Sequence, residues 1–336
     1  MEPRESIEVT EVPTSKSNSP RLAMGAGVKK MGLRFDPGAY GTTIVLVLGI
    51  IITSILSPAF LTVSNISNLL SQIAALGIVT MGQTIALVAG GIDLSVGSNV
   101  ALSGVVAGLM FQAGIPLWID CIVALLCATF IGLVNGVLIS ANRAHPFIIT
   151  LGMLTLLEGI AELITGGSPI NDMGALATTV GGILPIGIPT SVLILFVIVL
   201  LVWVFLNRVP LGRAIYAIGG NEEASFLSGV SIKRTKILLY TIVGLIAGIG
   251  ALVLSGILNA AEANIGVGLE LQSIAAAVIG GTTLIGGRGG AWRSLLGVLL
   301  LGFVSNSLNL LSIGANYQNI ALGIIVIIAV MVQKTR

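Results

Sequence analysis

The chain has 336 residues, of which 55% are apolar and only 9% charged, with a net charge of +2. Soluble globular domains carry about 25% charged residues, so this composition excludes a soluble globular domain. Long apolar runs also exclude an outer-membrane β-barrel, whose strands are short and alternating. Many of these runs are long enough to cross the roughly 30 Å of hydrocarbon in a bilayer. We expect an all-α polytopic membrane protein.

Residues 1–39 are polar and contain no apolar core followed by a small-residue cleavage site, so no secretory signal is expected. The run "PTSKSNSP" within them predicts a disordered tail. Residues 40–336 are predicted to form one membrane domain, in which glycine-rich stretches indicate some short or broken helices. The predicted spans are 40–57, 66–89, 94–113, 117–140, 146–165, 189–206, 237–256, 271–286, 294–312 and 317–333.

The distribution of basic residues tests this count of ten spans, because Lys and Arg collect in cytoplasmic loops. If the N-terminus is cytoplasmic, all 16 Lys and Arg fall on the inner side of the membrane and none on the outer side. Both chain ends are then cytoplasmic, and residues 207–236 form the main inner loop. Losing two neighbouring spans would preserve the same pattern, so eight spans is the alternative.

The stretch "AIGGNEEASFLSGV" (217–230) is a short polar segment inside this inner loop. Asn221 is a good N-cap, the acidic side chains of Glu222 and Glu223 suit the first turn, and Gly229 is placed to end the helix. The apolar Phe226 would lie on the resulting two turns. Such a helix either docks a cytoplasmic partner or lies flat in the lipid interface, and composition does not separate these alternatives.

The segment "GGNEEASFLSGVSI" resembles the cytoplasmic loop of bacterial ABC-importer permeases, whose signature is Glu-Ala-Ala, three residues, then Gly. Glu223, Ala224 and Gly229 match that signature, and Ser225 takes the place of its second Ala. The motifs "GGIDLSVGS", "PFIITLGMLTL", "SIAAAVIGGTTLIGGRGG" and "NSLNLL" follow the order found in permeases of the ribose, xylose, arabinose and galactoside importers. The resemblance, to the branched-chain permease superfamily, covers about residues 40–333.

This resemblance implies a fold similar to that of the vitamin-B12-importer type of permease, in the bacterial cytoplasmic (inner) membrane. It also implies three kinds of protein partner: an ABC ATPase subunit, an extracytoplasmic solute-binding protein and a second permease copy, identical or related. The ATPase would bind the inner helix. The residues implied in that contact are Gly220, Asn221, Glu222, Glu223, Ala224, Phe226, Leu227 and Gly229.

The solute implied by the resemblance is a monosaccharide or a similar polyhydroxylated compound. The chain departs from many relatives at Glu158, where they have Arg, at Gln272, where they have Asp, and at Trp292, which follows the "GGRGG" run. These differences bear on which solute is carried. A nucleoside, a branched amino acid or a furanone-type signal is the alternative, and a stand-alone secondary transporter is a more distant one.

Polar residues within or beside the predicted spans are candidates for lining the translocation pathway. They are Asp93, Ser95, Glu158, Asn306 and Asn309. Each has a structural alternative: Asp93 can cap the helix that follows it, and the two asparagines can bond neighbouring helices. The run around Asp93 is weakly echoed in "TTLIGGRGGAWRSLLGVLLLG", which hints at an internal duplication.

No pattern in the sequence indicates chemistry on covalent bonds. His145 is the single histidine, the two cysteines lie in one apolar run, and the glycine-rich runs lack a phosphate-binding P-loop. We therefore expect a non-catalytic permease with no cofactor, no metal and no nucleic-acid partner. ATP hydrolysis is expected on a partner subunit.

Overall fold

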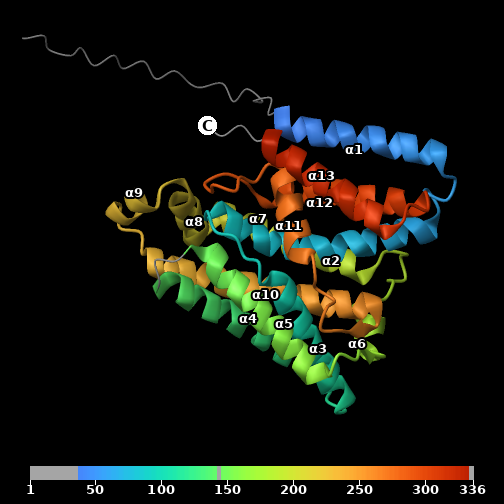
Figure 1. Cartoon of the computed structure of the whole chain (residues 1–336), viewed down its shortest axis with the longest axis horizontal. Helices are drawn as coiled ribbons and strands as arrows, with labels where there is room; N and C mark the ends of the chain where they lie inside the picture. The colour runs from blue at the N-terminus through green and yellow to red at the C-terminus, as the bar shows by residue number, and fades with distance from the viewer. Residues whose placement is uncertain (1–36, 142–144, 333–336) are drawn as a thin grey trace, which may run out of the picture. The chain divides into compact units, whose positions relative to one another are not determined.

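The computed structural model describes residues 37–141 and 145–332, which belong to one compact unit (Figure 1). The predicted tail lies outside the described residues except for its last three, which begin the first helix. The elements are α1 (Pro37–Leu56), α2 (Val63–Val88), α3 (Val96–Gln112), α4 (Leu117–Ala141), α5 (Pro146–Thr165), β1 (Ile170–Asn171), α6 (Ala175–Thr179), α7 (Thr190–Arg208), α8 (Pro210–Gly220), α9 (Glu222–Leu227), α10 (Ile232–Leu258), β2 (Ala260–Ala261), α11 (Leu269–Ile279), α12 (Ala291–Leu310) and α13 (Ala315–Val332).

Each of the ten predicted apolar segments coincides with a helix, and the protein is a helical membrane protein with several spans. In the described part of the chain, six helices are long and apolar enough to cross a membrane: α2, α4, α5, α7, α10 and α12. The prediction of one continuous span over 271–286 is wrong in detail. Helix α11 has 11 residues and ends at Ile279, so it extends only about 16 Å.

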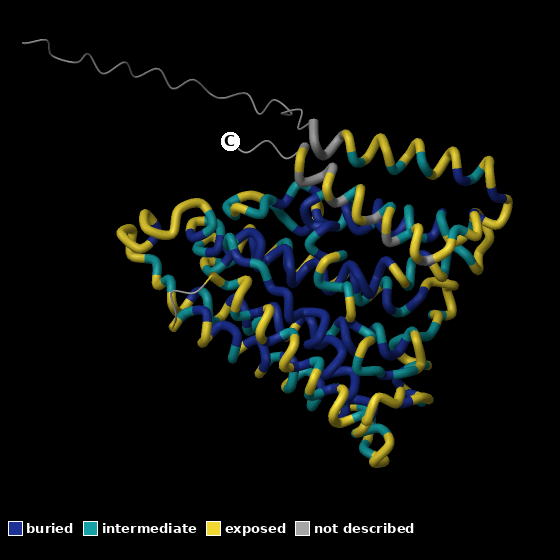
Figure 2. Tube along the Cα trace, in the orientation of Figure 1, coloured by how far each residue is buried: buried dark blue, intermediate teal, exposed yellow. Residues whose placement is uncertain are grey.

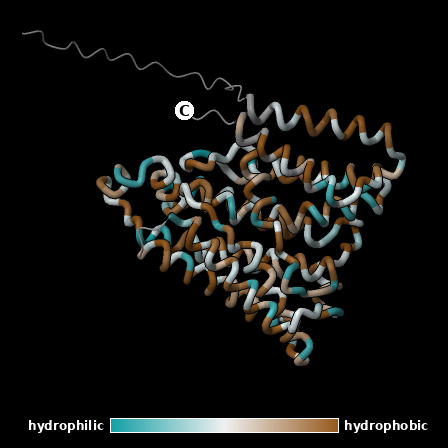
Figure 3. The backbone as a smooth tube through the Cα atoms, in the orientation of Figure 1, coloured by the Kyte–Doolittle hydropathy of each residue, from teal (hydrophilic) through white to brown (hydrophobic). Residues whose placement is uncertain are grey.

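The core is centred on α2 and α10, whose residues are buried along much of their length (Figure 2). Helix α10 packs closely on α4 because glycines bring the two backbones together: a Cβ added at Gly244 would lie 2.8 Å from the Cα of Gly132. Small residues are the usual means of close helix packing in a bilayer. Hydrophobic residues also cover exposed helices such as α1 (Figure 3), as expected for lipid contact.

Two of the loops that the ten-span prediction places outside, 166–188 and 257–270, are joined by a short pair of strands. β1 pairs antiparallel with β2, with Ile170 opposite Ala261. The Asn259 side chain also accepts a 2.8 Å hydrogen bond from the backbone N–H of Met173. The all-α prediction omitted these strands, because two-residue strands leave no periodic pattern in a sequence.

The predicted inner loop, 207–236, contains two helices rather than one. Helix α8 begins directly after α7, with Pro210 in its first turn, where the missing N–H of proline costs nothing. Ile215 and Ile218 of α8 are buried against the core. The loop therefore anchors the short helix α9 to the body of the protein.

Candidate functional site

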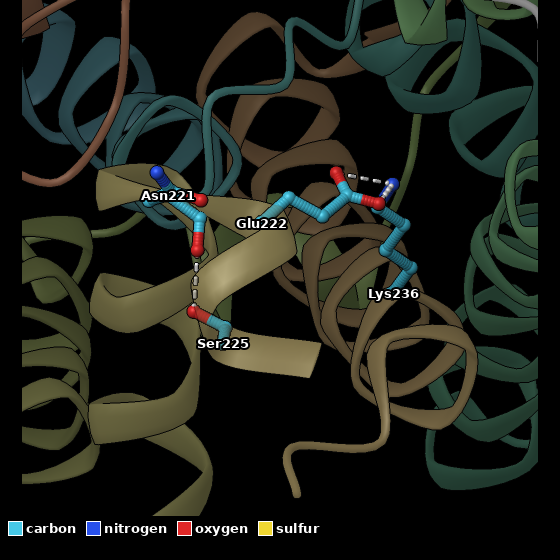
Figure 4. Close-up of polar contacts among 4 residues, drawn as sticks. All are labelled: Asn221, Glu222, Ser225 and Lys236. Atoms are coloured by element: carbon cyan, nitrogen blue, oxygen red, sulfur yellow. Dashed lines mark hydrogen bonds and ion pairs between the residues drawn. The ribbon is translucent and has the colours of Figure 1, made fainter. Parts of the chain in front are cut away.

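Helix α9 has the local geometry that the sequence predicts. The Asn221 side chain accepts a 2.8 Å hydrogen bond from the backbone N–H of Ala224 and so caps the helix. The Ser225 hydroxyl donates a 2.7 Å bond back to the Asn221 carbonyl (Figure 4). Gly229 has a φ of 86°, and the N–H of Val230 donates to the Ser225 carbonyl at 3.0 Å. The predicted cap and the predicted end of the helix are confirmed.

An ion pair fastens α9 to the start of α10. The Lys236 ammonium donates to both carboxylate oxygens of Glu222, at 2.7 and 2.9 Å (Figure 4). The Glu222 side chain is 53% exposed, so this pair contributes only about 0–1 kcal/mol to stability. Its main effect is therefore to fix the orientation of a short helix.

The apolar residues of α9 face away from the protein. Phe226 is 67% exposed and Leu227 is 79% exposed, whereas the neighbouring Ser225 is buried. Gly220, Glu223 and Ala224 are also exposed. Phe226 borders a groove of about 620 Å³, which reaches past Glu222 and Lys236 to His145 at the start of α5. Helix α9 thus presents an apolar tip beside a groove of mixed polar and apolar lining that includes the Glu222–Lys236 ion pair.

Helix α8 is held to the loop between α11 and α12 by its one tyrosine. The Tyr216 hydroxyl donates a 2.9 Å hydrogen bond to the carbonyl of Gly289. Burial raises the pKa of this hydroxyl, and the nearby charge of Arg293 offsets part of the rise. The hydroxyl consequently stays protonated at neutral pH and remains a donor.

Asp93 and Ser95 lie together in a buried turn between α2 and α3. One carboxylate oxygen of Asp93 accepts hydrogen bonds from the N–H and the hydroxyl of Ser95, at 2.9 and 2.6 Å. The Ser95 hydroxyl accepts a further 2.8 Å bond from the Asn135 amide of α4. The bond expected from Asp93 to the Ser95 amide is present, but the N-cap of α3 is Ser95 itself and makes no side-chain cap bond, so Asp93 holds the turn that precedes α3.

The remaining pathway candidates are dispersed. The Asn306 amide exchanges two hydrogen bonds with Asn65 of α2, at 2.9 and 3.1 Å, which is an interhelical contact. Asn309 is exposed and accepts a 2.8 Å bond from Gln318. Glu158 is half-buried on α5. Of the five candidates, only Asp93 and Ser95 are hydrogen-bonded to each other in the described structure.

Sequence reasoning missed several partners of these residues: Lys236, Asn65 and Asn135. Each partner lies far from its contact in the chain; Asn65 and Asn306, for example, are 241 residues apart. No spacing pattern connects such pairs before the fold is known. Within the described ranges, no group of three or more His, Cys, Asp or Glu side chains could hold a metal ion.

Comparison with known proteins identifies the family. Residues 65–330 match the family described as "branched-chain amino acid transport system / permease component". The ribose import permease of Escherichia coli K12 is 39% identical over 297 residues, covering 87% of this chain and 92% of the relative. The ribose import permease of Haemophilus influenzae is 38% identical over 292 residues, covering 86% and 90%.

The D-allose transport system permease of Escherichia coli K12 is 35% identical over 297 residues, covering 88% of this chain and 91% of the relative. No solved structure matches the chain. The family match spans most of the membrane domain and includes α9 together with the helices that support it. The chain therefore belongs to this family of permease components, as a multi-pass, non-catalytic ABC importer subunit of the bacterial cytoplasmic (inner) membrane.

Proposed function

We propose that this permease imports a monosaccharide or a similar polyhydroxylated solute. An extracytoplasmic binding protein delivers the solute, two permease copies or related permeases enclose one pathway, and ATPase subunits bind on the inner side. The names of the matched relatives, which are ribose and allose permeases, support the solute class. The observation that carries the proposed mechanism is the apolar tip of α9.

Helix α9 suits docking better than lipid contact. Membrane-surface helices bury a broad apolar face, and their binding strengthens with the apolar area they bury. Helix α9 has six residues, and its exposed large apolar side chains are Phe226 and Leu227. It is capped by Asn221 and ion-paired through Glu222, so its tip is presented in one orientation. A preoriented pair of apolar side chains fits a protein cleft, which we assign to the ATPase subunit.

The polar candidates divide by accessibility. Glu158 is half-buried and Asn309 is exposed, so we propose these two for the solute pathway. Asp93, Ser95 and Asn306 are buried and already hydrogen-bonded within the protein. We retain them as pathway candidates that hold the start of α3 and the α2–α12 pair in place rather than contacting solute directly.

The solute class is tested by transport with the complete importer. The complex is purified through a tag on this chain, reconstituted with its binding protein in proteoliposomes, and given labelled ribose, allose, adenosine or leucine. We expect ATP-dependent uptake of a sugar and none of adenosine or leucine. Uptake of adenosine or leucine alone would replace the sugar assignment with the nucleoside or branched amino acid alternative. Uptake without any ATPase subunit would indicate a secondary transporter.

We also propose ten membrane crossings in a fold of the vitamin-B12-importer type. Contacts between loops support this topology, because they join outer loops to outer loops and inner loops to inner loops. Residues 170–171 pair with 260–261, which the proposal places outside. The Gly287 N–H donates to the Val88 carbonyl, and Tyr216 bonds Gly289, which joins three loops that the proposal places inside.

Reporter fusions test this topology. Fusions after residues 143, 220, 290 and 336 are expected to report the cytoplasm, and fusions near 62, 115, 178 and 264 are expected to report the outside. The physical reason is the confinement of Lys and Arg to the inner side. One reproducible reversal among these eight positions would refute ten spans, and loss of one neighbouring pair would favour eight.

A further inference from the structure

Three chain segments meet backbone to backbone beside α9: the end of α2, the end of α8 and the loop between α11 and α12. The Gly287 N–H donates a 2.9 Å hydrogen bond to the Val88 carbonyl at the end of α2. A Cβ added at Gly219 would overlap that same carbonyl and lie 2.6 Å from the Gly287 nitrogen. We call Val88, Gly90, Gly219, Gly286 and Gly287 the glycine junction.

Gly286 of the junction also has no room for a side chain. A Cβ at Gly286 would lie 2.7 Å from the Gly90 nitrogen and 2.8 Å from the Gly219 carbonyl oxygen. Gly90 and Gly286 also have positive φ values, 77° and 96°, which favour glycine. The three segments therefore touch with no side chain between them at this point.

Helix α9 is connected to this junction by a very short link. Gly219 and Gly220 end α8, and Asn221 then caps α9. The hydrogen bond from Tyr216 to Gly289 gives α8 a second attachment to the α11–α12 loop. Figure 1 shows α9 beyond α8 at this end of the molecule. Because only Gly220 and Asn221 separate Gly219 from α9, a movement of α9 displaces Gly219 as well.

The junction leads onward to the starts of two helices. After Gly90, the chain enters the turn in which Asp93 and Ser95 fix the start of α3. After Gly286 and Gly287 the chain enters α12. Near its start, the Ser294 hydroxyl is hydrogen-bonded to the hydroxyl of buried Thr282 at 3.1 Å and accepts a 2.8 Å bond from the Thr84 hydroxyl of α2. The two sequence runs that echo each other thus touch in the fold, at Gly90 and Gly286.

We propose that Gly219, through its backbone contacts with Val88 and Gly287, is the positioning residue that transmits movement of α9 to the starts of α3 and α12. The inference rests on the proposed docking of the ATPase at α9. Close-packed contacts move as units, because interiors are dense and transmit strain. Side chains could absorb a small shift by changing rotamer, but a backbone contact without side chains cannot.

A glycine outside the junction and outside the ATPase contact supplies the control. A Cβ at Gly152 on α5 would meet nothing within 4 Å, so Gly152→Ala makes the same substitution away from both sites. Gly219→Ala forces the junction apart, and Tyr216→Phe removes only the hydrogen bond to Gly289. Each variant is made in the complete importer, reconstituted with its binding protein. Three quantities are measured: the ATPase subunit retained on purification, the rate of ATP hydrolysis, and the amount of solute transported per ATP hydrolysed.

Gly219→Ala is expected to retain the ATPase subunit, because Phe226 is unchanged, but to lower transport per ATP on the order of tenfold, a usual size for coupling between sites. Tyr216→Phe is expected to lower transport per ATP by about fivefold, which is the effect of losing one neutral hydrogen bond. Gly152→Ala should give the same transport per ATP as the wild type. A general loss of stability would reduce yield and hydrolysis without changing this ratio.

Normal transport per ATP in Gly219→Ala, or an equal loss in Gly152→Ala, would overturn the proposal. If Gly219→Ala does not yield a monodisperse complex, Tyr216→Phe decides: a lowered ratio supports the junction and an unchanged ratio refutes it. Docking is judged separately by Phe226→Ala. If that variant binds the ATPase as the wild type does, the proposed function of α9 is wrong, whatever the junction variants show.

Discussion

Replacing Phe226 with Ala is expected to release the ATPase subunit from the importer while leaving the permease folded. Phe226 is the largest apolar side chain on α9, and 67% of it is exposed in the isolated chain. Aromatic residues buried at interfaces commonly contribute about 2 kcal/mol or more, which corresponds to roughly a 30-fold loss of affinity. The measurement is co-purification of the ATPase with the permease, followed by titration of the purified subunits.

Two comparisons separate this contact from other effects. Phe130 on α4 is 64% exposed, so Phe130→Ala removes the same ring from a membrane span and should leave ATPase binding unchanged. Glu223→Lys reverses a charge near the N-terminus of α9, where the helix dipole is worth about 0.3–1 kcal/mol. At high salt this charge effect is screened, so Phe226→Ala should remain the more damaging change.

The opposite result has a clear meaning. If Phe226→Ala and Glu223→Lys both retain the ATPase and transport solute normally, α9 is a lipid-surface element. The ion pair between Glu222 and Lys236 would then serve only to hold that element against α10. Membrane yield must be equal for all variants, since a lower yield would report on insertion rather than docking.

Local features of this site could be predicted because they depend on neighbours in the chain. The Asn221 cap acts on an amide three residues away, and Gly229 ends α9 through its own backbone conformation. Asp93 likewise accepts a hydrogen bond from the amide of Ser95, two residues on, in the turn before α3. Such interactions leave a sequence signal, because only a few residue types satisfy them.

Contacts across the fold left no comparable signal. The chain has 44 glycines, and nothing in the sequence distinguishes Gly219, whose Cβ would clash, from Gly220, whose Cβ would not. The end of α11 at Ile279 was missed for a related reason. The glycine-rich run after it is uncharged up to Arg288, so hydropathy alone extended the predicted span into a loop.

The helix pair α4–α10 provides the second large expected effect, this time on folding. Gly244→Leu would place a side chain where a Cβ already overlaps the Ala128 carbonyl and lies 2.8 Å from the Cα of Gly132. Overpacking a well-packed core typically costs about 1–3 kcal/mol. Here backbone atoms rather than side chains oppose the new group, so we expect the upper end of that range.

Gly152→Leu is the matched control for Gly244→Leu, because a Cβ at Gly152 on α5 would meet nothing within 4 Å. A loss of about 3 kcal/mol corresponds to a fall in Tm on the order of 10 °C, measured on detergent-purified protein. The Tm of Gly152→Leu should equal or slightly exceed that of the wild type, since leucine favours helix more than glycine does. Equal melting of both variants would mean that α4 and α10 can separate without cost. The core that supports α9 would then have to lie elsewhere, on α2 and α8.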